Sequence, residues 1–322
     1  MEIEWLIDQL KRYPNLQAED MLKALYQSEF GCAHFTLGEK QGLKHILKEL
    51  DGLSSAYTPA DLVEPIGDRF CRVHLAKIKA RGLNPATLAR LFFLSSQTKP
   101  ENQNNFVAKL ACFLDCCKKG TLPFDPVYVQ TLIAENQKSG SPAIHHSPKF
   151  HQLYHPAYRV IRADYGALLP LLCKIDTVMR QKESAIVAID GNSAAGKTTL
   201  SSFLAQVYDA NVLHMDHFFL RPSQRTPARL SSPGGNVDYE RFLHDVLNPL
   251  SKGGSFTFCP YNCKTQSFDD PITVTPKPLR IVEGAYSMHP TLSGNYDVSV
   301  FLSLDFASQK SRILLRNGVS MQ

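Results

Sequence analysis

Residues 185–199 read AIVAIDGNSAAGKTT. A run of β-branched and small apolar residues breaks into a turn bounded by Gly191 and Gly196, and an apolar pattern of helical period begins at Leu200. The turn has the spacing G-x-x-x-x-G-K-T between an expected strand and an expected helix, which is the setting of a phosphate-binding P-loop. The pattern and its setting together favour a P-loop over a chance glycine turn.

Each residue type in this turn has a chemical reason. The two glycines allow the backbone to wrap so that successive N–H groups converge on phosphate oxygens. Lys197 brings a positive charge toward the β- and γ-phosphates, the Thr198 hydroxyl suits Mg²⁺, and the first turn of the helix adds the positive end of its dipole. ATP and Mg²⁺ are therefore the expected ligands. The nucleotide-binding residues that we predict are Gly191, Asn192, Ser193, Ala194, Ala195, Gly196, Lys197, Thr198 and Thr199.

Length and charge limit the class of protein. A chain of 322 residues has room for roughly two domains of ~150 residues each. Its net charge of +5 suits anionic ligands and makes nucleic acid an unfavoured partner. No apolar run approaches the ~18 residues of a membrane span, and the first residues lack the basic start of a signal peptide, so we expect a cytoplasmic protein without a membrane partner. The eight cysteines show no paired C-x-x-C spacing and are expected to be reduced thiols.

The first half of the chain predicts helices. Apolar residues recur at helical spacing, as in Trp5, Leu6 and Leu10, and Asn84 precedes Pro85 as a cap precedes a first turn. We expect an α-helical domain over residues 1–163, whose role the sequence does not define. An amphipathic helix over 164–184 then leads directly into the P-loop domain, 185–322, without a flexible linker.

A histidine-rich segment lies near the end of this first half. His145, His146, His151 and His155, followed by Arg159, have the chemistry of an anion or metal site. No carboxylate lies among them and prolines interrupt their spacing. We therefore favour a polar connector with packed histidines and tyrosines, and leave the binding site as the alternative.

Carboxylates follow two strands of the second half. Residues 211–216 read as an apolar strand that ends in Asp216, and residues 280–283 as another that ends in Glu283. Because a strand–helix–strand crossover is right-handed and gives parallel strands, Asp216 is expected beside the phosphate loop. Such an acid accepts a hydroxyl proton or holds Mg²⁺, and Glu283 fits the strand-end carboxylate that helps to hold Mg²⁺ in P-loop folds. A capping or turn carboxylate is the structural alternative for each.

Residues 185–317 resemble the uridine kinase/phosphoribulokinase group of P-loop kinases, over about two fifths of the chain. The motifs that carry the resemblance are the P-loop, 215–219 (MDHFF), 236–242 (NVDYERF), 260–263 (PYNC), 282–284 (VEG) and the late Arg312 and Arg316. The resemblance implies an α/β P-loop kinase domain, with a parallel sheet flanked by helices. It also implies ATP-dependent phosphorylation of a hydroxyl on a small molecule, a nucleoside or a related alcohol.

The resemblance also assigns expected roles to single residues. Asp216 is the base that activates the acceptor hydroxyl, and Lys197 and Arg316 complete the catalytic set. Glu283 helps to hold Mg²⁺ together with Thr198 and Asp216. The expected substrate-binding residues are Asp238 for ribose hydroxyls, Tyr261 and Gln266 at the base pocket, and Arg312.

The sequence departs from the family at the base pocket and at its end. Phe219, Cys263 and Gln266 stand where family members usually carry tyrosine, another aromatic residue and histidine, so the acceptor stays open. The family continues into a lid, a last strand and a closing helix, whereas this sequence ends at Gln322. We expect either a fragment or another element in the role of the lid, and a homo-oligomer stays open. The alternative function is a regulatory or interaction protein whose P-loop senses ATP or GTP.

Overall fold

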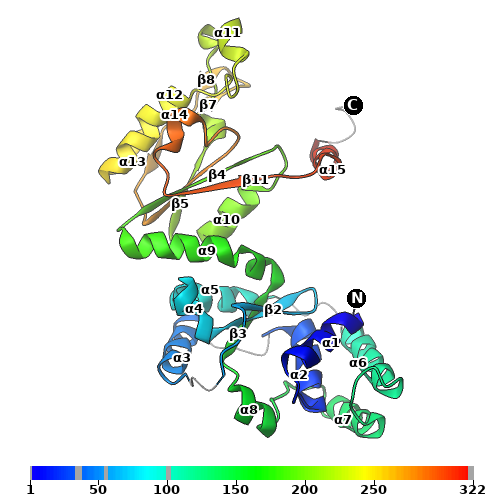
Figure 1. Ribbon diagram of the computed structural model, residues 1–322. Helices are drawn as coiled ribbons and strands as arrows, with labels where there is room; N and C mark the ends of the chain where they lie inside the picture. Colours follow the sequence, from blue (N-terminus) through cyan, green and yellow to red (C-terminus); the bar gives the residue numbers. More distant parts are fainter. Residues whose placement is uncertain (1, 33–37, 54–56, 99–102, 318–322) are drawn as a thin grey trace. The chain divides into compact units, whose positions relative to one another are not determined.

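The computed structural model describes residues 2–317 except 33–37, 54–56 and 99–102. The chain divides into two compact units, an N-terminal unit (Met1–Cys173) and a C-terminal unit (Lys174–Gln322), with the boundary inside helix α9 (Ala163–Gln181) (Figure 1). Within the described residues, no helix is both long enough and apolar enough to cross a membrane.

The N-terminal unit combines helices with a small antiparallel sheet. Strands β1 (Val63–Ile66), β2 (Phe70–His74) and β3 (Tyr158–Arg162) pair in the order β1-β2-β3. The helices are α1 (Glu2–Arg12), α2 (Ala18–Phe30), α3 (Glu39–Asp51), α4 (Leu75–Arg81), α5 (Pro85–Ser96), α6 (Gln103–Lys118), α7 (Pro126–Lys138) and α8 (Pro148–Tyr154). The side chain of Asn84 accepts a hydrogen bond from the N–H of Ala86 at 3.0 Å, which fixes the start of α5.

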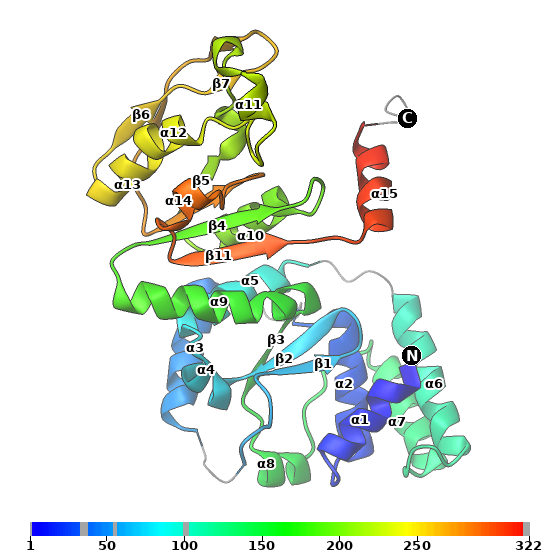
Figure 2. The ribbon, with the colours of Figure 1, turned by 45° about the horizontal axis from the view of Figure 1, so that its top comes forward.

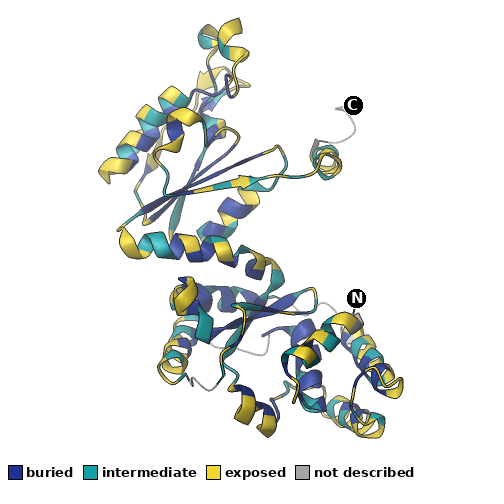
Figure 3. Ribbon diagram, in the orientation of Figure 1, coloured by how far each residue is buried: buried dark blue, intermediate teal, exposed yellow. Residues whose placement is uncertain are grey.

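The sheet of the N-terminal unit was missed by the sequence analysis, which predicted a mostly α-helical domain and named no strand there. The strands have four or five residues each, and polar side chains interrupt their apolar pattern. All five residues of β2 are buried, including Arg72 and His74 (Figure 3). Buried charged residues in a short strand do not give the period-two alternation that signals a half-exposed strand.

One apolar core cluster of the N-terminal unit lies among helices α1, α2, α6, α7 and α8. Its members include Leu6, Met21, Leu25, Phe106 and Phe113, all at most 2% exposed. At an average of about 25 cal/mol per Å² of apolar surface, such side chains each contribute roughly 1.5–3 kcal/mol to folding. The predicted apolar helical patterns of this half therefore form its core.

The C-terminal unit is built on a four-stranded parallel sheet in the order β11-β4-β10-β5 (Figure 2). The strands are β4 (Ala185–Gly191), β5 (Ala210–His214), β10 (Leu279–Glu283) and β11 (Val298–Leu302). Helix α10 (Lys197–Val207) packs on one face, and an apolar cluster that includes Phe218, Phe242 and Leu250 packs against Ile186 and Val282 on the sheet. This is the arrangement expected of an α/β P-loop kinase domain.

The C-terminal unit has further helices and strands besides these. They are η1 (Met215–His217), η2 (Pro222–Gln224), α11 (Pro227–Leu230), α12 (Tyr239–Phe242), η3 (Leu243–Leu247), α13 (Asn248–Lys252), β6 (Phe256–Phe258), β7 (Tyr261–Asn262), β8 (Ser267–Phe268), β9 (Ile272–Val274), α14 (Pro290–Ser293) and α15 (Phe306–Asn317). Strands β6 and β9 form one antiparallel pair, and β7 and β8 form another.

Candidate active site

The phosphate loop begins where β4 meets β11. A Cβ atom at Gly191 would lie 2.1 Å from the backbone oxygen of Leu302, and the φ of Gly191 is 146°. No other residue fits there without moving the neighbouring strand. At the other end of the loop Gly196 has a φ of 97°, and α10 begins with the next residue. The two glycines of the motif therefore stand where the backbone requires them.

The side chain of Lys197 folds back onto the backbone of the phosphate loop. Its Nζ donates hydrogen bonds to the carbonyl oxygens of Gly191 at 2.8 Å and Asn192 at 3.0 Å. These bonds hold the ammonium group at the mouth of the loop, where its charge faces an incoming phosphate. Lys197 is thus placed as a P-loop lysine before any ligand contact is made.

The two strand-end carboxylates follow neighbouring strands. Strand β10 pairs in parallel with both β4 and β5, and Glu283 is in register with Ile189 and His214. Asp216 follows two residues after the end of β5, within η1. Because these strands are parallel, both acids lie at the carboxyl edge of the sheet, where ligands bind in open α/β sheets.

Glu283 joins the phosphate loop to β5. Its Oε1 accepts a hydrogen bond from the Thr198 hydroxyl at 3.3 Å and lies 2.6 Å from Nδ1 of His214. The hydrogen bond between Glu283 and His214 raises the pKa of His214, since the carboxylate stabilises the protonated ring. Burial, followed by the charge of His214, lowers the pKa of His217. In the sequence Asp216 therefore lies between two histidines whose pKa values are shifted in opposite directions.

His214 was not singled out by the sequence analysis, which read it only as part of a strand. Its signal was its position, two residues before Asp216 on the same strand end. The parallel pairing of β5 with β10 places it beside Glu283, and that pairing is invisible in the sequence around either residue.

One cavity of about 590 Å³ collects most of the predicted site. Its lining includes Lys197, Thr198, Asp216 and Glu283. The complete set is Ser193, Ala194, Ala195, Gly196, Lys197, Thr198, Thr199, Asp216, Glu283, Gly284, Ala285, Arg312 and Arg316. A cationic loop, two carboxylates and two arginines around one space provide what phosphoryl transfer requires: charge neutralisation and an acceptor for a proton.

Helix α15 supplies the two arginines and is tied to the phosphate loop. Arg312 donates to the carbonyl oxygen of Ala194 at 3.3 Å, and the side-chain amide of Gln309 donates to that of Ser193 at 3.2 Å. These bonds place α15 over the middle of the loop. Gln309 was missed by the sequence analysis because its role depends on the path of the chain after β11.

Asp190 was also missed by the sequence analysis, and its carboxylate accepts hydrogen bonds from backbone N–H groups next to the site. Its Oδ1 accepts hydrogen bonds from the N–H groups of Gly191 at 2.7 Å and Tyr286 at 3.0 Å, and its Oδ2 accepts one from Met288 at 3.0 Å. The carboxylate therefore holds the start of the phosphate loop and the loop after β10 in one arrangement. An acid at the end of the strand before the first glycine was the available signal.

Asp238, Tyr261 and Gln266 lie outside that lining. Asp238 is 3% exposed, accepts a hydrogen bond from the Gln224 side chain at 3.0 Å and caps α12 through the N–H of Arg241 at 3.2 Å. Tyr261 is 4% exposed, and its hydroxyl has no hydrogen-bond partner among the described residues. Gln266 is exposed in the turn between β7 and β8, with a φ of 54°.

Arg241 connects this second group to the strand ends. It donates to the carbonyl oxygens of His217 at 2.8 Å and Cys259 at 3.0 Å, and its Nε lies 3.7 Å from a carboxylate oxygen of Asp238. Nδ1 of His217 is buried without a hydrogen-bond partner in the described part of the chain. This nitrogen belongs to the residue directly after Asp216, and a bound molecule can form a hydrogen bond with it.

The residues at the loop suit Mg²⁺ bound together with a nucleotide. Among the described residues, no group of three or more histidines, cysteines, aspartates or glutamates has the geometry to hold a metal ion alone. In phosphoryl-transfer sites Mg²⁺ usually takes one or two protein ligands and receives the others from phosphates and water. A hydroxyl and a carboxylate 3.3 Å apart, Thr198 and Glu283, form a donor set of this kind.

Comparison with known proteins yields similarities to solved structures only. No family model matches the chain, and no curated protein sequence matches it. Among solved structures, the chain is similar to a protein described as a possible uridine kinase from Bacillus stearothermophilus, with a TM-score of 0.34 and 19% sequence identity. The match covers 45% of this chain and 92% of that chain. At this TM-score and identity the similarity does not assign a function to the chain.

Proposed function

We propose that the C-terminal unit is an ATP-dependent kinase that transfers the γ-phosphoryl group to a hydroxyl of a small molecule. The observation that carries the proposal is the shared cavity of Lys197, Thr198, Asp216 and Glu283. The sequence resemblance to uridine kinases supports a nucleoside or a related alcohol as the acceptor.

The residues of the cavity divide the work by charge. Lys197 and the loop N–H groups would bind the phosphates, and Arg312 and Arg316 would offset the charge that spreads over the transferred group. Thr198 and Glu283 would hold Mg²⁺, which supplies further neutralisation of phosphate charge when bound.

Asp216 would act on the acceptor. A bond forms between the acceptor oxygen and the γ-phosphorus, the bond from that phosphorus to the ADP oxygen breaks, and the proton of the hydroxyl passes to the Asp216 carboxylate. Asp238 and Tyr261 would contact the remainder of the acceptor. The buried, unpartnered Tyr261 hydroxyl supports this, because a polar atom without a partner is costly unless a ligand completes it.

A nucleotide sensor is the second candidate. It would use the same loop to bind ATP or GTP and would need no proton acceptor. The position of Asp216 in the lining of the cavity favours the kinase, since a sensor needs no proton acceptor beside the phosphates.

The test is ADP release by the full chain with ATP and Mg²⁺. Nucleosides, pantothenate-like alcohols and sugar phosphates are supplied one at a time. The kinase predicts ADP release that depends on one acceptor class and is abolished in Lys197→Met, while Lys252→Met, an exposed lysine on α13, retains it. Tight nucleotide binding without acceptor-dependent ADP release would instead support the sensor.

A further inference from the structure

A second cavity, of about 330 Å³, lies wholly within the N-terminal unit. Residues from α2, α3, α8, β3 and the segment before α8 line it. The cationic and histidine side chains of its lining are Lys23, His45, His145, His146, His151 and Arg159. Three of the four residues of the histidine-rich segment thus face one space, although the sequence analysis favoured a simple connector.

Of the two cations that line this cavity, only one has an ion-pair partner among the described residues. The guanidinium of Arg159 is matched by Glu49, with N–O distances of 3.0 and 2.6 Å. Lys23 donates a hydrogen bond to the carbonyl oxygen of Ile144 at 2.7 Å but makes no ion pair within the described residues. Burial, followed by the charge of Arg72, lowers the pKa of Lys23 to about 8, so its ammonium group is still mostly charged at pH 7. Lys23 is thus the lining cation that no carboxylate of the described residues pairs with, although the ionised Asp20 attracts it without forming an ion pair.

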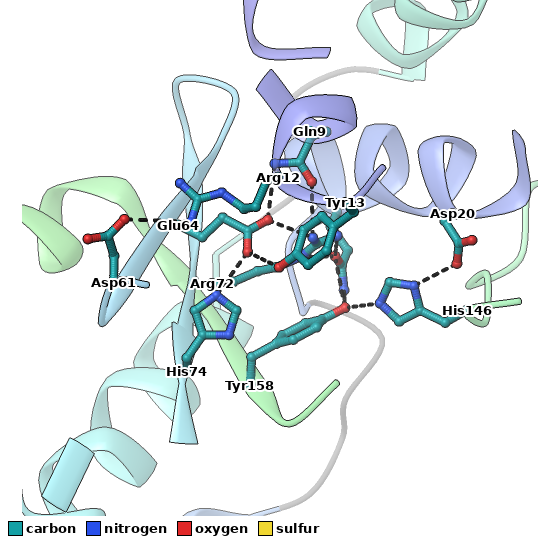
Figure 4. Close-up of polar contacts among 11 residues, drawn as sticks. Gln9, Arg12, Tyr13, Asp20, Asp61, Glu64, Arg72, His74, His146 and Tyr158 are labelled. Carbon is teal, nitrogen blue, oxygen red and sulfur yellow. Dashed lines mark hydrogen bonds and ion pairs between the residues drawn. The ribbon is translucent and has the colours of Figure 1, made fainter. Parts of the chain in front are cut away.

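A buried chain of hydrogen bonds fixes one wall of the cavity (Figure 4). His146 contacts Asp20 through Nδ1 at 2.9 Å and the Tyr158 hydroxyl through Nε2 at 2.6 Å. Because an ionised carboxylate only accepts, the Nδ1–H donates to Asp20, and Nε2 accepts from Tyr158. The Tyr158 oxygen can then accept from the side-chain amide of Gln27, which lies at 3.2 Å.

The same series of hydrogen bonds continues into a buried ion pair. The Gln27 oxygen accepts from Arg72 at 2.8 and 3.0 Å, and Arg72 pairs with Glu64 at 2.8 Å, with both side chains at most 1% exposed. Taking such charges out of water costs several kcal/mol per ion before their attraction is counted. Fully satisfied buried networks of this kind hold neighbouring groups in one geometry, as binding sites require.

The hydrogen-bond donors that line the cavity outnumber the two oxygens of a carboxylate ligand. Lys23 has two N–H donors besides the one that it gives to Ile144, and the imidazoles of His45, His145 and His151 offer more. A phosphate ester presents three acceptor oxygens and up to two negative charges, and it matches such a set better. A metal site is disfavoured, since these histidines form no metal-binding group with other described residues.

We propose that this cavity binds a small phosphorylated molecule, with Lys23 as the charged anchor and the surrounding histidines as hydrogen-bond donors. The volume, at the lower end of the range for ligand pockets, suits a single phosphorylated sugar or a molecule of that size. The proposal concerns a site separate from the phosphate loop and stands whether or not the kinase function holds.

Calorimetric titration of the full chain tests it, with ribose 5-phosphate, ribose and inorganic phosphate as probes. All titrations use the Lys197→Met background, so that the phosphate loop contributes little. We expect ribose 5-phosphate to bind and ribose not to bind. Lys23→Met should weaken binding about 10- to 100-fold, the worth of one charge-assisted hydrogen bond. The matched control is Lys79→Met, at an exposed lysine of α4.

Two further variants keep the test decisive. Lys23→Arg restores the charge and should restore most of the binding. His151→Gln changes an exposed residue, so the unit should stay folded even if Lys23→Met does not, and it should weaken binding by a smaller factor. Equal affinity for ribose and ribose 5-phosphate, or unchanged binding in folded Lys23→Met, would overturn the proposal. Equal, Lys23-dependent affinity for inorganic phosphate would overturn the assignment to an ester.

Discussion

The phosphate-loop site of the C-terminal unit and the polar network of the N-terminal unit both hold charged groups in fixed positions, by different means. Lys197 is held by carbonyl groups five and six residues before it. His146 is held by Asp20, which lies 126 residues away in the sequence. The contacts of Lys197 lie within one short sequence motif, whereas those of His146 form only when distant helices and strands pack together.

The two sites also differ in their contact with water. Thr198 and Thr199 are exposed and Lys197 is partly exposed, so the loop can exchange water for phosphate at little cost. Glu64 is fully buried and takes hydrogen bonds or ion pairs from Gln9, Tyr13, Arg72 and His74. A buried charge must be matched completely, because every missing partner costs the full desolvation penalty of the group. Substitutions should therefore affect function in the first site and folding in the second.

The largest effect is expected for Asp216→Asn in the C-terminal unit. The amide keeps the shape of the side chain but cannot take the proton of the acceptor. We expect kcat to fall about 10²- to 10⁴-fold, the usual worth of a positioned general base, with nucleotide affinity largely retained. The measurement is steady-state ADP release with the acceptor that the panel of nucleosides, alcohols and sugar phosphates identifies.

The matched control is Asp209→Asn, at an exposed aspartate beside the start of β5 that pairs only with Lys277 at 2.8 Å in the described chain. It should leave kcat unchanged. Activity of Asp216→Asn within about twofold of the wild type would remove Asp216 from the role of base. The C-terminal site would then have no identified proton acceptor.

The next effect belongs to the buried ion pair. Arg72→Met leaves Glu64 buried without its main cation and should destabilise the N-terminal unit by about 3–5 kcal/mol. Trp5, the only tryptophan of the chain, packs against the core of this unit, so its fluorescence during urea unfolding reports on that unit.

Removing both charges separates the ion pair from its surroundings. In the double variant Arg72→Met/Glu64→Gln no charge is left unmatched, and we expect most of the lost free energy of unfolding to return. A loss below about 1 kcal/mol in the single variant would contradict a tightly coupled network, as would a double variant no more stable than the single one.

The contrast explains what the sequence allowed us to predict. Gly191, Lys197 and Thr198 could be assigned because their spacing alone implies backbone geometry. Asp216 and Glu283 could be placed because parallel strands bring their ends to one edge. These steps need only local pattern and one topological rule.

The remaining features depend on contacts between distant segments. The short strand β2 was missed because Arg72 and His74 interrupt its apolar pattern, and their partner Glu64 lies on β1, ten residues from His74. His214 and Asp190 act through neighbours that pairing and loop geometry supply. The histidine-rich segment gave the right residue types, but the cavity that three of them line also requires α2, α3 and β3.

The smallest of the predicted effects uses pH to probe the network without changing a side chain. Burial lowers the pKa of His146 to about 3, whereas an exposed histidine has a pKa near 6.5. Between these values the unfolded chain binds a proton at this residue and the folded chain does not. The free energy of unfolding should therefore fall as the pH drops below about 6.5, by about 2 kcal/mol at pH 5.

The window between pH 7 and 5 isolates this histidine from the buried carboxylates. Hydrogen bonds from His146 and Ser147 outweigh burial and lower the pKa of Asp20; at Glu64 the Arg72 charge does the same. The stability that these acids contribute is lost only at lower pH. Urea unfolding followed by Trp5 fluorescence should show the loss in the wild type and a flatter profile in His146→Gln. His155→Asn, at an exposed histidine just after α8, should keep the wild-type slope. A wild-type profile that is flat from pH 7 to 5 would mean that His146 accepts a proton in the folded state, and the network would then be as open to water as the phosphate loop.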